Sequence, residues 1–122
     1  MKSVLLVFLG GGIGSALRYL IGIWLKNGTG FPSATFLVNM VGSFLIGVLM
    51  GWIIRNTNTS SSFALLLITG VCGGFTTFSA FALENYQFFK NGNFTMLSLY
   101  VGGSLIIGIL LVGLGIWFSK ML

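Results

Sequence analysis

The stretch GVCGGFTTFSAF, residues 70–81, decides how this chain can be built, because it is poor helix material within 28 uncharged residues, 56–83. Adjacent glycines at 73 and 74 and β-branched threonines at 76 and 77 have low helix propensity. If this run crosses a bilayer, a break in the helix is tolerated only where protein, a cavity or an ion replaces the lost backbone partners. Alternatively the helix is continuous, the glycines form a packing notch and the hydroxyls bond back to the preceding turn. The residues alone leave both possibilities open.

Outside this stretch, isolated charges divide the chain into apolar segments. The charged residues are Lys2, Arg18, Lys26, Arg55, Glu84, Lys90 and Lys120. The gaps 27–54, 56–83 and 91–119 hold 28, 28 and 29 residues, and a membrane helix needs about 20. The gap 3–17 holds only 15 residues, so the first helix must continue past Arg18. The sequence therefore predicts an all-α membrane protein, a single four-helix transmembrane domain over residues 1–122, with helices at about 3–24, 33–54, 62–89 and 96–119.

Composition supports a membrane protein. Apolar residues make up 56% of the chain and charged residues 6%, whereas a soluble domain is about one quarter charged. The predicted connections, Lys26–Phe31, Arg55–Ser61 and Lys90–Thr95, are short and rich in Asn, Gly, Thr and Ser, as loops are. The first apolar stretch lacks the small-residue site of a cleavable signal peptide. We expect a multi-pass protein of the cell (inner) membrane, with the lipid bilayer as its surroundings.

The cations are almost evenly divided between the two sides of such a protein. Lys2, Arg55 and Lys120 fall on one side, and Lys26 and Lys90 on the other, with Arg18 near that second side. The positive-inside bias is thus three against two or three against three. Either the chain inserts in both orientations, or a weak bias is read through another feature.

Several function classes are disfavoured by what the chain lacks. It has no His, no Asp, one Cys and one Glu, and acid–base catalysis needs a positioned titratable group, usually with a partner. Transition-metal ligation through Cys or His is equally disfavoured. The net charge of +5 is spread singly along an apolar chain, unlike the clustered basic patch of a nucleic-acid binder. We predict that the chain is not an enzyme and does not bind nucleic acid.

A glycine motif near the N-terminus resembles a dinucleotide-binding fingerprint but fits close helix packing better. In VFLGGGIGS, residues 7–15, the third glycine of the fingerprint is replaced by Ser15, and no acidic residue follows about 20 positions on. Glycines four residues apart instead let helix backbones approach closely. The same spacing recurs twice, so the pairs are Gly10 with Gly14, Gly47 with Gly51, and Gly70 with Gly74.

Polar and aromatic residues inside the spans outline a possible ion path. Asn39 lies within an apolar span, and Tyr100 and Ser104 are four residues apart on one helix face. Such residues are candidate sites, although Asn and Ser also join helices. Phe75, Phe78 and Phe81 share a face. The stripe is either packing, or a set of positively polarised ring edges that favours a small anion.

Arg18 and Glu84 are the charged residues that fall inside the predicted spans. A charge at that depth needs a partner or access to water. The sequence allows Arg18 and Glu84 to pair with each other or each to lie at an interface.

These residues together resemble the Fluc family of fluoride channels, also called CrcB proteins, over nearly the whole chain. The resemblance is carried by GGGIG at 10–14 with Arg18-Tyr19, by Thr35 to Asn39 with Gly42, and most specifically by GGFTTFSAF at 73–81 with Glu84. It implies an antiparallel, dual-topology homodimer, two copies of the chain enclosing two fluoride pathways. Fluoride that enters as HF and ionises inside would leave passively through them.

The resemblance also implies roles for individual residues. Backbone carbonyls of Gly73 and Thr76 from both chains would bind a structural sodium ion (Na+) at a break in the third helix. The anion pathway would be lined by Asn39, Phe78, Phe81, Tyr100 and Ser104, with Arg18 at the aqueous vestibule. Where the polar track on the fourth helix often continues with a hydroxyl residue, this chain has Gly108.

Two rival functions remain open at this point. A small dual-topology multidrug exporter has a similar size and uses a membrane carboxylate for proton coupling. Its glutamate belongs in the first helix, whereas Glu84 lies near the end of the third. The chain could also be one subunit of a heterodimeric fluoride channel, although Asn39, Phe78 and Phe81 are all present.

Overall fold

The structure of the protein is a computed structural model that describes residues 1–26, 28 and 30–122. Among these residues there are helices and loops and no strand. Four helical segments are long and apolar enough to cross a membrane: Lys2–Trp24, Ser33–Arg55, Ser61–Lys90 and Phe94–Ser119. Their ends differ from the predicted ends by two residues at most. Residues 27 and 29, in the predicted connection Lys26–Phe31, lie outside the described residues.

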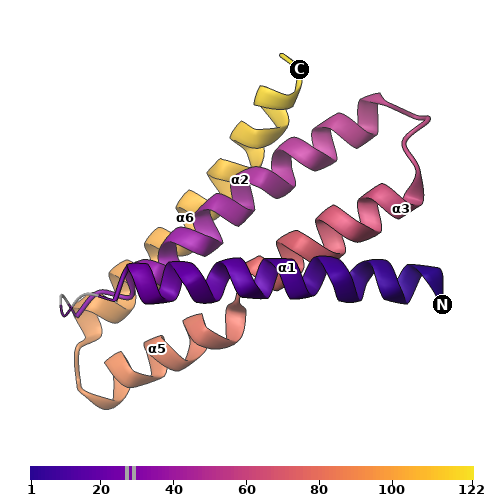
Figure 1. Ribbon diagram of the computed structural model, residues 1–122. Coiled ribbons are helices and arrows are strands. Elements are labelled where there is room, and N and C mark those ends of the chain that lie inside the picture. Colours follow the sequence, from indigo (N-terminus) through magenta and orange to yellow (C-terminus); the bar gives the residue numbers. More distant parts are fainter. Residues whose placement is uncertain (27, 29) are drawn as a thin grey trace.

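The third segment is the irregular one. It consists of α3 (Ser61–Ala64), the π-helix η1 (Leu65–Cys72), α4 (Gly73–Phe75) and α5 (Phe78–Lys90). Between α4 and α5 the backbone is extended, with φ −81° and ψ 157° at Thr76, and φ −149° and ψ 114° at Thr77. The chain changes direction here, so that α5 leaves the line of α3 and η1 and runs towards the start of the last helix (Figure 1).

The other three segments are single α-helices, α1 (Lys2–Trp24), α2 (Ser33–Arg55) and α6 (Phe94–Ser119). Figure 1 shows α2 and α6 side by side, and α1 crossing the third segment. Within the third segment, η1 and α4 pack on α1, and α5 packs mainly on α6. The extended residues between α4 and α5 therefore lie where the two helix pairs meet.

Glycines allow α1 to cross the third segment closely. A Cβ atom on Gly70 would lie 2.8 Å from Cα of Gly10, and one on Gly14 would lie 2.7 Å from the backbone nitrogen of Phe75. A Cβ on Gly74 would lie 2.9 Å from Cα of Gly11. Real Cβ atoms do not approach so closely, so the backbones can touch only because no side chain intervenes. The predicted packing role of Gly10, Gly14, Gly70 and Gly74 is confirmed.

The α2–α6 pair uses the same device. A Cβ on Gly115 of α6 would lie 2.8 Å from the backbone nitrogen of Val48, and one on Gly51 of α2 would lie 3.0 Å from Cβ of Ser119. Beyond these contacts Arg55, the last residue of α2, donates to the carbonyl of Ser119, which is fully buried. A cation at a helix C-terminus stabilises its free carbonyls. The hydrogen bond from Arg55 thus joins the C-terminal ends of α2 and α6.

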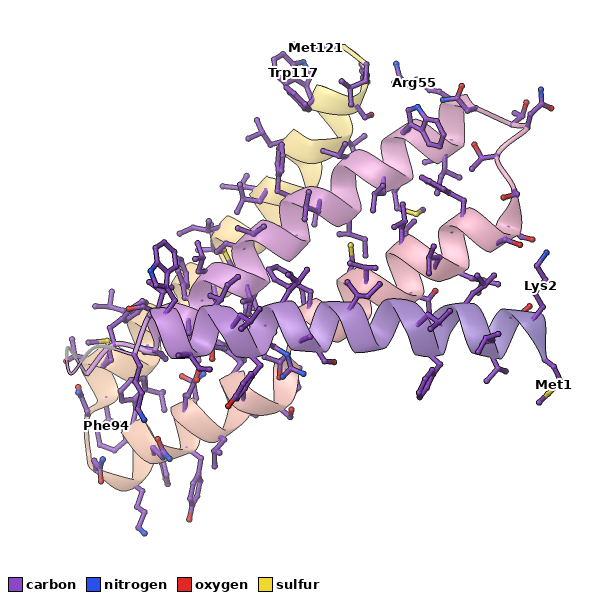
Figure 2. The ribbon with its side chains drawn as sticks, viewed as in Figure 1. Met1, Lys2, Arg55, Phe94, Trp117 and Met121 are labelled. Atoms are coloured by element: carbon purple, nitrogen blue, oxygen red, sulfur yellow. The ribbon has the colours of Figure 1, made fainter. Side chains whose placement is uncertain are left out.

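Outward-facing side chains are apolar along the spans. Only 11% of the most apolar window of α1, and of that of α6, is buried. Figure 2 shows side chains projecting outward around the helices, with Lys2, Arg55 and Met121 towards one end and Phe94 at the other. Surfaces this apolar need lipid or another apolar chain against them. The protein is a multi-pass membrane protein of the cell membrane.

Candidate functional site

The backbone at Thr77 is held by a side chain of α2. The N–H of Thr77 donates to Oδ1 of Asn39 at 2.8 Å, and Nδ2 of Asn39 donates to the carbonyl of Thr77 at 3.2 Å. In a continuous α-helix this N–H would instead donate to the carbonyl four residues earlier, that of Gly73. The Asn39 amide therefore leaves the Gly73 carbonyl without its usual helical donor.

The Thr76 carbonyl loses its usual donor in a similar way. That donor would be the N–H of Ala80, which bonds to Oγ1 of Thr77 at 3.2 Å. Thr77 is thus the N-cap of α5, and its hydroxyl satisfies one of the free N–H groups at the start of this helix. The hydroxyl of Thr76 bonds back to the carbonyl of Cys72 at 2.9 Å, as in the packing alternative drawn from the sequence. The carbonyls of Gly73 and Thr76, three residues apart, are thus left available for another partner.

Residues of α1 hold the carbonyl that lies between them. Nε of Arg18 donates to the carbonyl of Gly74 at 3.1 Å, and Oγ of Ser15 donates to it at 3.4 Å. Arg18 also lines a cavity of about 120 Å³ together with Thr35 and Thr77. The side chain of Arg18 is half-buried, and it contacts both the Gly74 carbonyl and the cavity beside it.

Four of the predicted pathway residues line one cavity. Asn39, Phe78, Phe81 and Ser104 all contact a cavity of about 140 Å³ between α2, α5 and α6. A larger one, of about 350 Å³, adjoins it at Asn39 and Phe78 and is lined by Gly73 and Thr76 as well. The structure thus brings four of the five predicted anion-pathway residues close to Gly73 and Thr76, whose carbonyls are available.

Tyr100 lies apart from this cavity lining. Its side chain is 2% exposed, and its ring packs edge-on against Phe81 with centroids 4.9 Å apart. The Phe81 ring is in turn 5.9 Å from that of Phe78. Phe78 is 78% exposed in the single chain. The aromatic residues therefore form a continuous row from a buried tyrosine to an open phenylalanine.

The lone carboxylate is held by two hydroxyl groups. Glu84 accepts a hydrogen bond from Oγ1 of Thr35 at 2.5 Å and one from the hydroxyl of Tyr100 at 2.7 Å. Arg18 and Glu84 thus bond to different partners and do not pair with each other. The sequence interpretation missed the role of Thr35. A carboxylate inside an apolar span needs donors at its own depth, and that requirement was the signal that could have found Thr35.

Known proteins match this chain over nearly its whole length. The family model described as CrcB-like protein, Camphor Resistance (CrcB), matches residues 5–116. A protein of Phocaeicola vulgatus is 48% identical over 98% of this chain and 100% of its own length. One from Oceanobacillus iheyensis is 43% identical over 95% of this chain and 90% of its own, and one from Agrobacterium fabrum 43% over 100% and 99%.

Each of these three relatives is named a fluoride-specific ion channel, FluC. The matches extend over nearly the full length of both chains, and the family model over residues 5–116 includes the residues that line the three cavities described above as well as Thr76 and Thr77. This chain belongs to the CrcB family.

Proposed function

We propose that this protein is a fluoride-selective channel that lets fluoride leave the cell passively and so lowers its cytoplasmic concentration. The observation that carries the proposal is the cavity lined by Asn39, Phe78, Phe81 and Ser104 in a chain whose relatives are named fluoride-specific ion channels. The prediction that the chain is not an enzyme agrees with those names.

The chemistry of the cavity suits a small, strongly hydrated anion. A selective pore must replace the water around the ion with donors close enough to bind it and weak enough to release it. One N–H of the Asn39 amide is bonded to Thr77, which leaves the second for the ion, and Ser104 adds a hydroxyl. The edges of Phe78 and Phe81 carry the positive part of the ring quadrupole. None of these groups carries a full positive charge that would hold the ion too tightly.

Arg18 and Tyr100 do not line the anion cavity and have separate roles in this proposal. Arg18 lines a separate small cavity, where its charge would attract anions to the vestibule. Tyr100 supports the Phe81 ring and donates its hydroxyl to Glu84, so it would act on the path from behind the aromatic row. A Cβ atom on Gly108 would lie 3.6 Å from Oγ of Ser43. Ser43 therefore supplies a hydroxyl near the place where the polar track on α6 lacks one.

We propose further that the third segment is a broken helix that binds a structural sodium ion. Among the residues that the structure describes, no group of three His, Cys, Asp or Glu could hold a metal ion, so a cation would depend on backbone oxygen. The carbonyls of Gly73 and Thr76 fit this requirement, because their usual helical donors bond elsewhere. Carbonyls of unwound membrane helices coordinate Na+ in other proteins.

A second copy of the chain, in antiparallel orientation, would complete the site. Gly73 is exposed and Phe78 is 78% exposed in the single chain, so both are open to a partner. The balanced cations, three on one side and two or three on the other, give little reason for one fixed orientation. A dual-topology homodimer would bring two pairs of carbonyls to one cation and cover the open side of each anion cavity.

The alternatives are less well supported. A proton-coupled multidrug exporter would need a carboxylate exposed to substrate, whereas Glu84 is bonded to Thr35 and Tyr100. A subunit of a heterodimeric channel would be expected to lack some pathway residues, whereas this chain has all of those named above.

Purified protein in liposomes loaded with fluoride tests the proposal. We expect rapid passive efflux of fluoride, no comparable efflux of chloride, and loss of fluoride efflux in Phe81→Ile. Ile106→Leu, on the outward face of α6, is the matched control and should leave efflux unchanged. Equal permeation of chloride, or efflux that requires a proton gradient, would contradict the proposal.

A further inference from the structure

We infer that Asn39 is a positioning residue for the interruption of the third segment at Thr76 and Thr77, because its side-chain amide takes the place of the helical acceptor of the Thr77 N–H and so keeps the Gly73 carbonyl free. This inference deepens the proposed function and rests on it where a cation at the Gly73 and Thr76 carbonyls is concerned. It gives Asn39 a role beyond that of a donor to the permeating anion.

The geometry of the pair is reciprocal. Asn39 accepts from the N–H of Thr77 at 2.8 Å and donates to the carbonyl of the same residue at 3.2 Å. One primary amide thus satisfies both polar groups of one peptide residue. An alanine, serine or leucine at position 39 could not do this, because none has an acceptor and a donor at the required separation.

The extended residues Thr76 and Thr77 contact α2 at a second position as well. Gly42, one turn after Asn39, faces the Thr76 methyl group, and a Cβ there would clash with that methyl. Val38, next to Asn39, is 1% exposed, which fixes α2 at this level. The backbone of α2 is therefore placed so that the Asn39 amide meets Thr77 and the surface beside it accepts Thr76.

Removal of the amide has a defined consequence. In an apolar interior, an N–H without a partner costs free energy, and the nearest conventional partner for Thr77 N–H is the Gly73 carbonyl. Without Asn39 the two would bond to each other and extend α4 by a turn. The Gly73 carbonyl would then be occupied and less able to bind a cation. Asn39 thus links the anion cavity that it lines to the proposed cation site.

A selective label can report on this single hydrogen bond. Thr76 and Thr77 are the only adjacent threonines in the sequence. Threonine labelled with ¹³C at the carbonyl and ¹⁵N at the amide therefore gives one carbonyl-to-amide correlation peak, that of Thr77, in solid-state NMR of the full-length protein in lipid. The same preparation can be melted in Na+ or in a large organic cation to measure the Na+ concentration that gives half of the full stabilisation.

Three variants separate the contributions. Asn39→Leu removes acceptor and donor, and we expect the Thr77 peak to move by more than its linewidth and the Na+ midpoint to rise roughly tenfold, as for the exchange of about one hydrogen bond. Asn39→Asp keeps the acceptor for Thr77 N–H and should shift the midpoint less. Asn85→Leu is the matched control, because Asn85 is buried and its amide bonds to a backbone carbonyl of its own helix, that of Phe81. It should lower the melting temperature without moving the peak or the midpoint.

The outcomes distinguish the inference from the proposed function. If Asn39→Leu leaves the Thr77 peak in place, Asn39 does not position the interruption and the inference is overturned. Wild-type protein that transports fluoride but does not respond to Na+ would overturn both the sodium site and its link to Asn39. If Asn39→Leu moves the peak as expected but the wild-type protein transports no fluoride, the positioning role is supported and the channel is contradicted.

Discussion

The α2–α6 pair and the third segment satisfy their backbone hydrogen-bonding groups in opposite ways. In α2 and α6 the backbone satisfies itself, and side chains serve for packing, with one added bond from Arg55 to Ser119. Around Thr76 and Thr77 the backbone is extended, and its polar groups bond to side chains that come from α1 and α2, namely Arg18 and Asn39. The backbone hydrogen bonds of the regular helices lie within each helix, whereas those of the irregular segment depend on side chains of neighbouring helices.

We expect the largest effect from a substitution where α1 contacts the third segment. Gly14→Leu would push a side chain into the backbone at Phe75, where even a Cβ would lie 2.7 Å from the nitrogen. We expect a loss of more than about 3 kcal/mol, at or above the upper end for overpacking, and little folded protein. Gly12→Leu is the control, because nothing lies within 4 Å of a Cβ there. Yield of monodisperse protein on size-exclusion chromatography measures both, and equal yields would contradict the close crossing.

Replacing arginine by glutamine should lower the free energy of unfolding more beside the third segment, at Arg18, than at the end of α2, at Arg55. Arg18→Gln removes the charged donor to the Gly74 carbonyl within the membrane, and we expect a loss of about 2 kcal/mol, typical of a charge-assisted hydrogen bond. Arg55→Gln removes the donor to Ser119 at the exposed end of α2, where water can substitute, and should cost about 1 kcal/mol or less. Thermal unfolding in one detergent compares them. A larger effect at Arg55 would reverse the comparison.

Tyr100→Phe tests the hydroxyl pair at Glu84. The substitution keeps the ring against Phe81 and removes one of the two donors to the carboxylate. We expect a loss of about 1.5 kcal/mol, because a carboxylate in an apolar span is left with Thr35 alone. Tyr19→Phe, whose ring is 70% exposed, should leave the melting temperature unchanged. Equal melting of Tyr100→Phe and wild type would show that water replaces the lost donor.

The smallest expected difference compares two helix caps. Thr77→Ala removes the hydroxyl that caps α5 through the Ala80 N–H, and Ser60→Ala removes the exposed one that caps α3 through Phe63. A cap is worth about 1 kcal/mol. We expect that cost at Thr77, and less at Ser60 because water is available there. Chemical denaturation resolves differences of this size, and a costlier Ser60→Ala would contradict the expectation that water replaces the lost cap at Ser60.

Much of the fold was predictable because membrane spans depend on length and polarity. The seven charges and the apolar runs between them located each span to within two residues. The composition of residues 73–77 left a break and a continuous helix both open, and in the structure Thr76 and Thr77 have extended backbone angles. The π-helix over Leu65–Cys72 was not predictable, since its sequence is an ordinary apolar run and the wider winding depends on its packing against α1.

The roles of the candidate site residues stay predictions, and their contacts could not be predicted from the sequence. Asn39, Phe78, Phe81 and Ser104 do share a cavity. That the Asn39 amide bonds to the backbone of Thr77, and that Thr35 bonds to Glu84, depend on how α2 lies against the third segment. No local pattern in a single sequence specifies the rotation of one helix relative to another, and these contacts follow from that rotation.

The fastening of Arg55 to Ser119 also makes the protein convenient to label. Arg55 and Ser119 form the hydrogen bond between α2 and α6 at this end, and the short loop after Arg55 takes no part in it. The loop residues Asn56, Thr57 and Asn58 are exposed. The only cysteine, Cys72, is buried. Asn58→Cys would therefore offer a single reactive thiol to a membrane-impermeant maleimide, next to the face that carries both chain termini. The fraction of thiol that reacts in sealed vesicles would give directly the proportion of chains in each orientation.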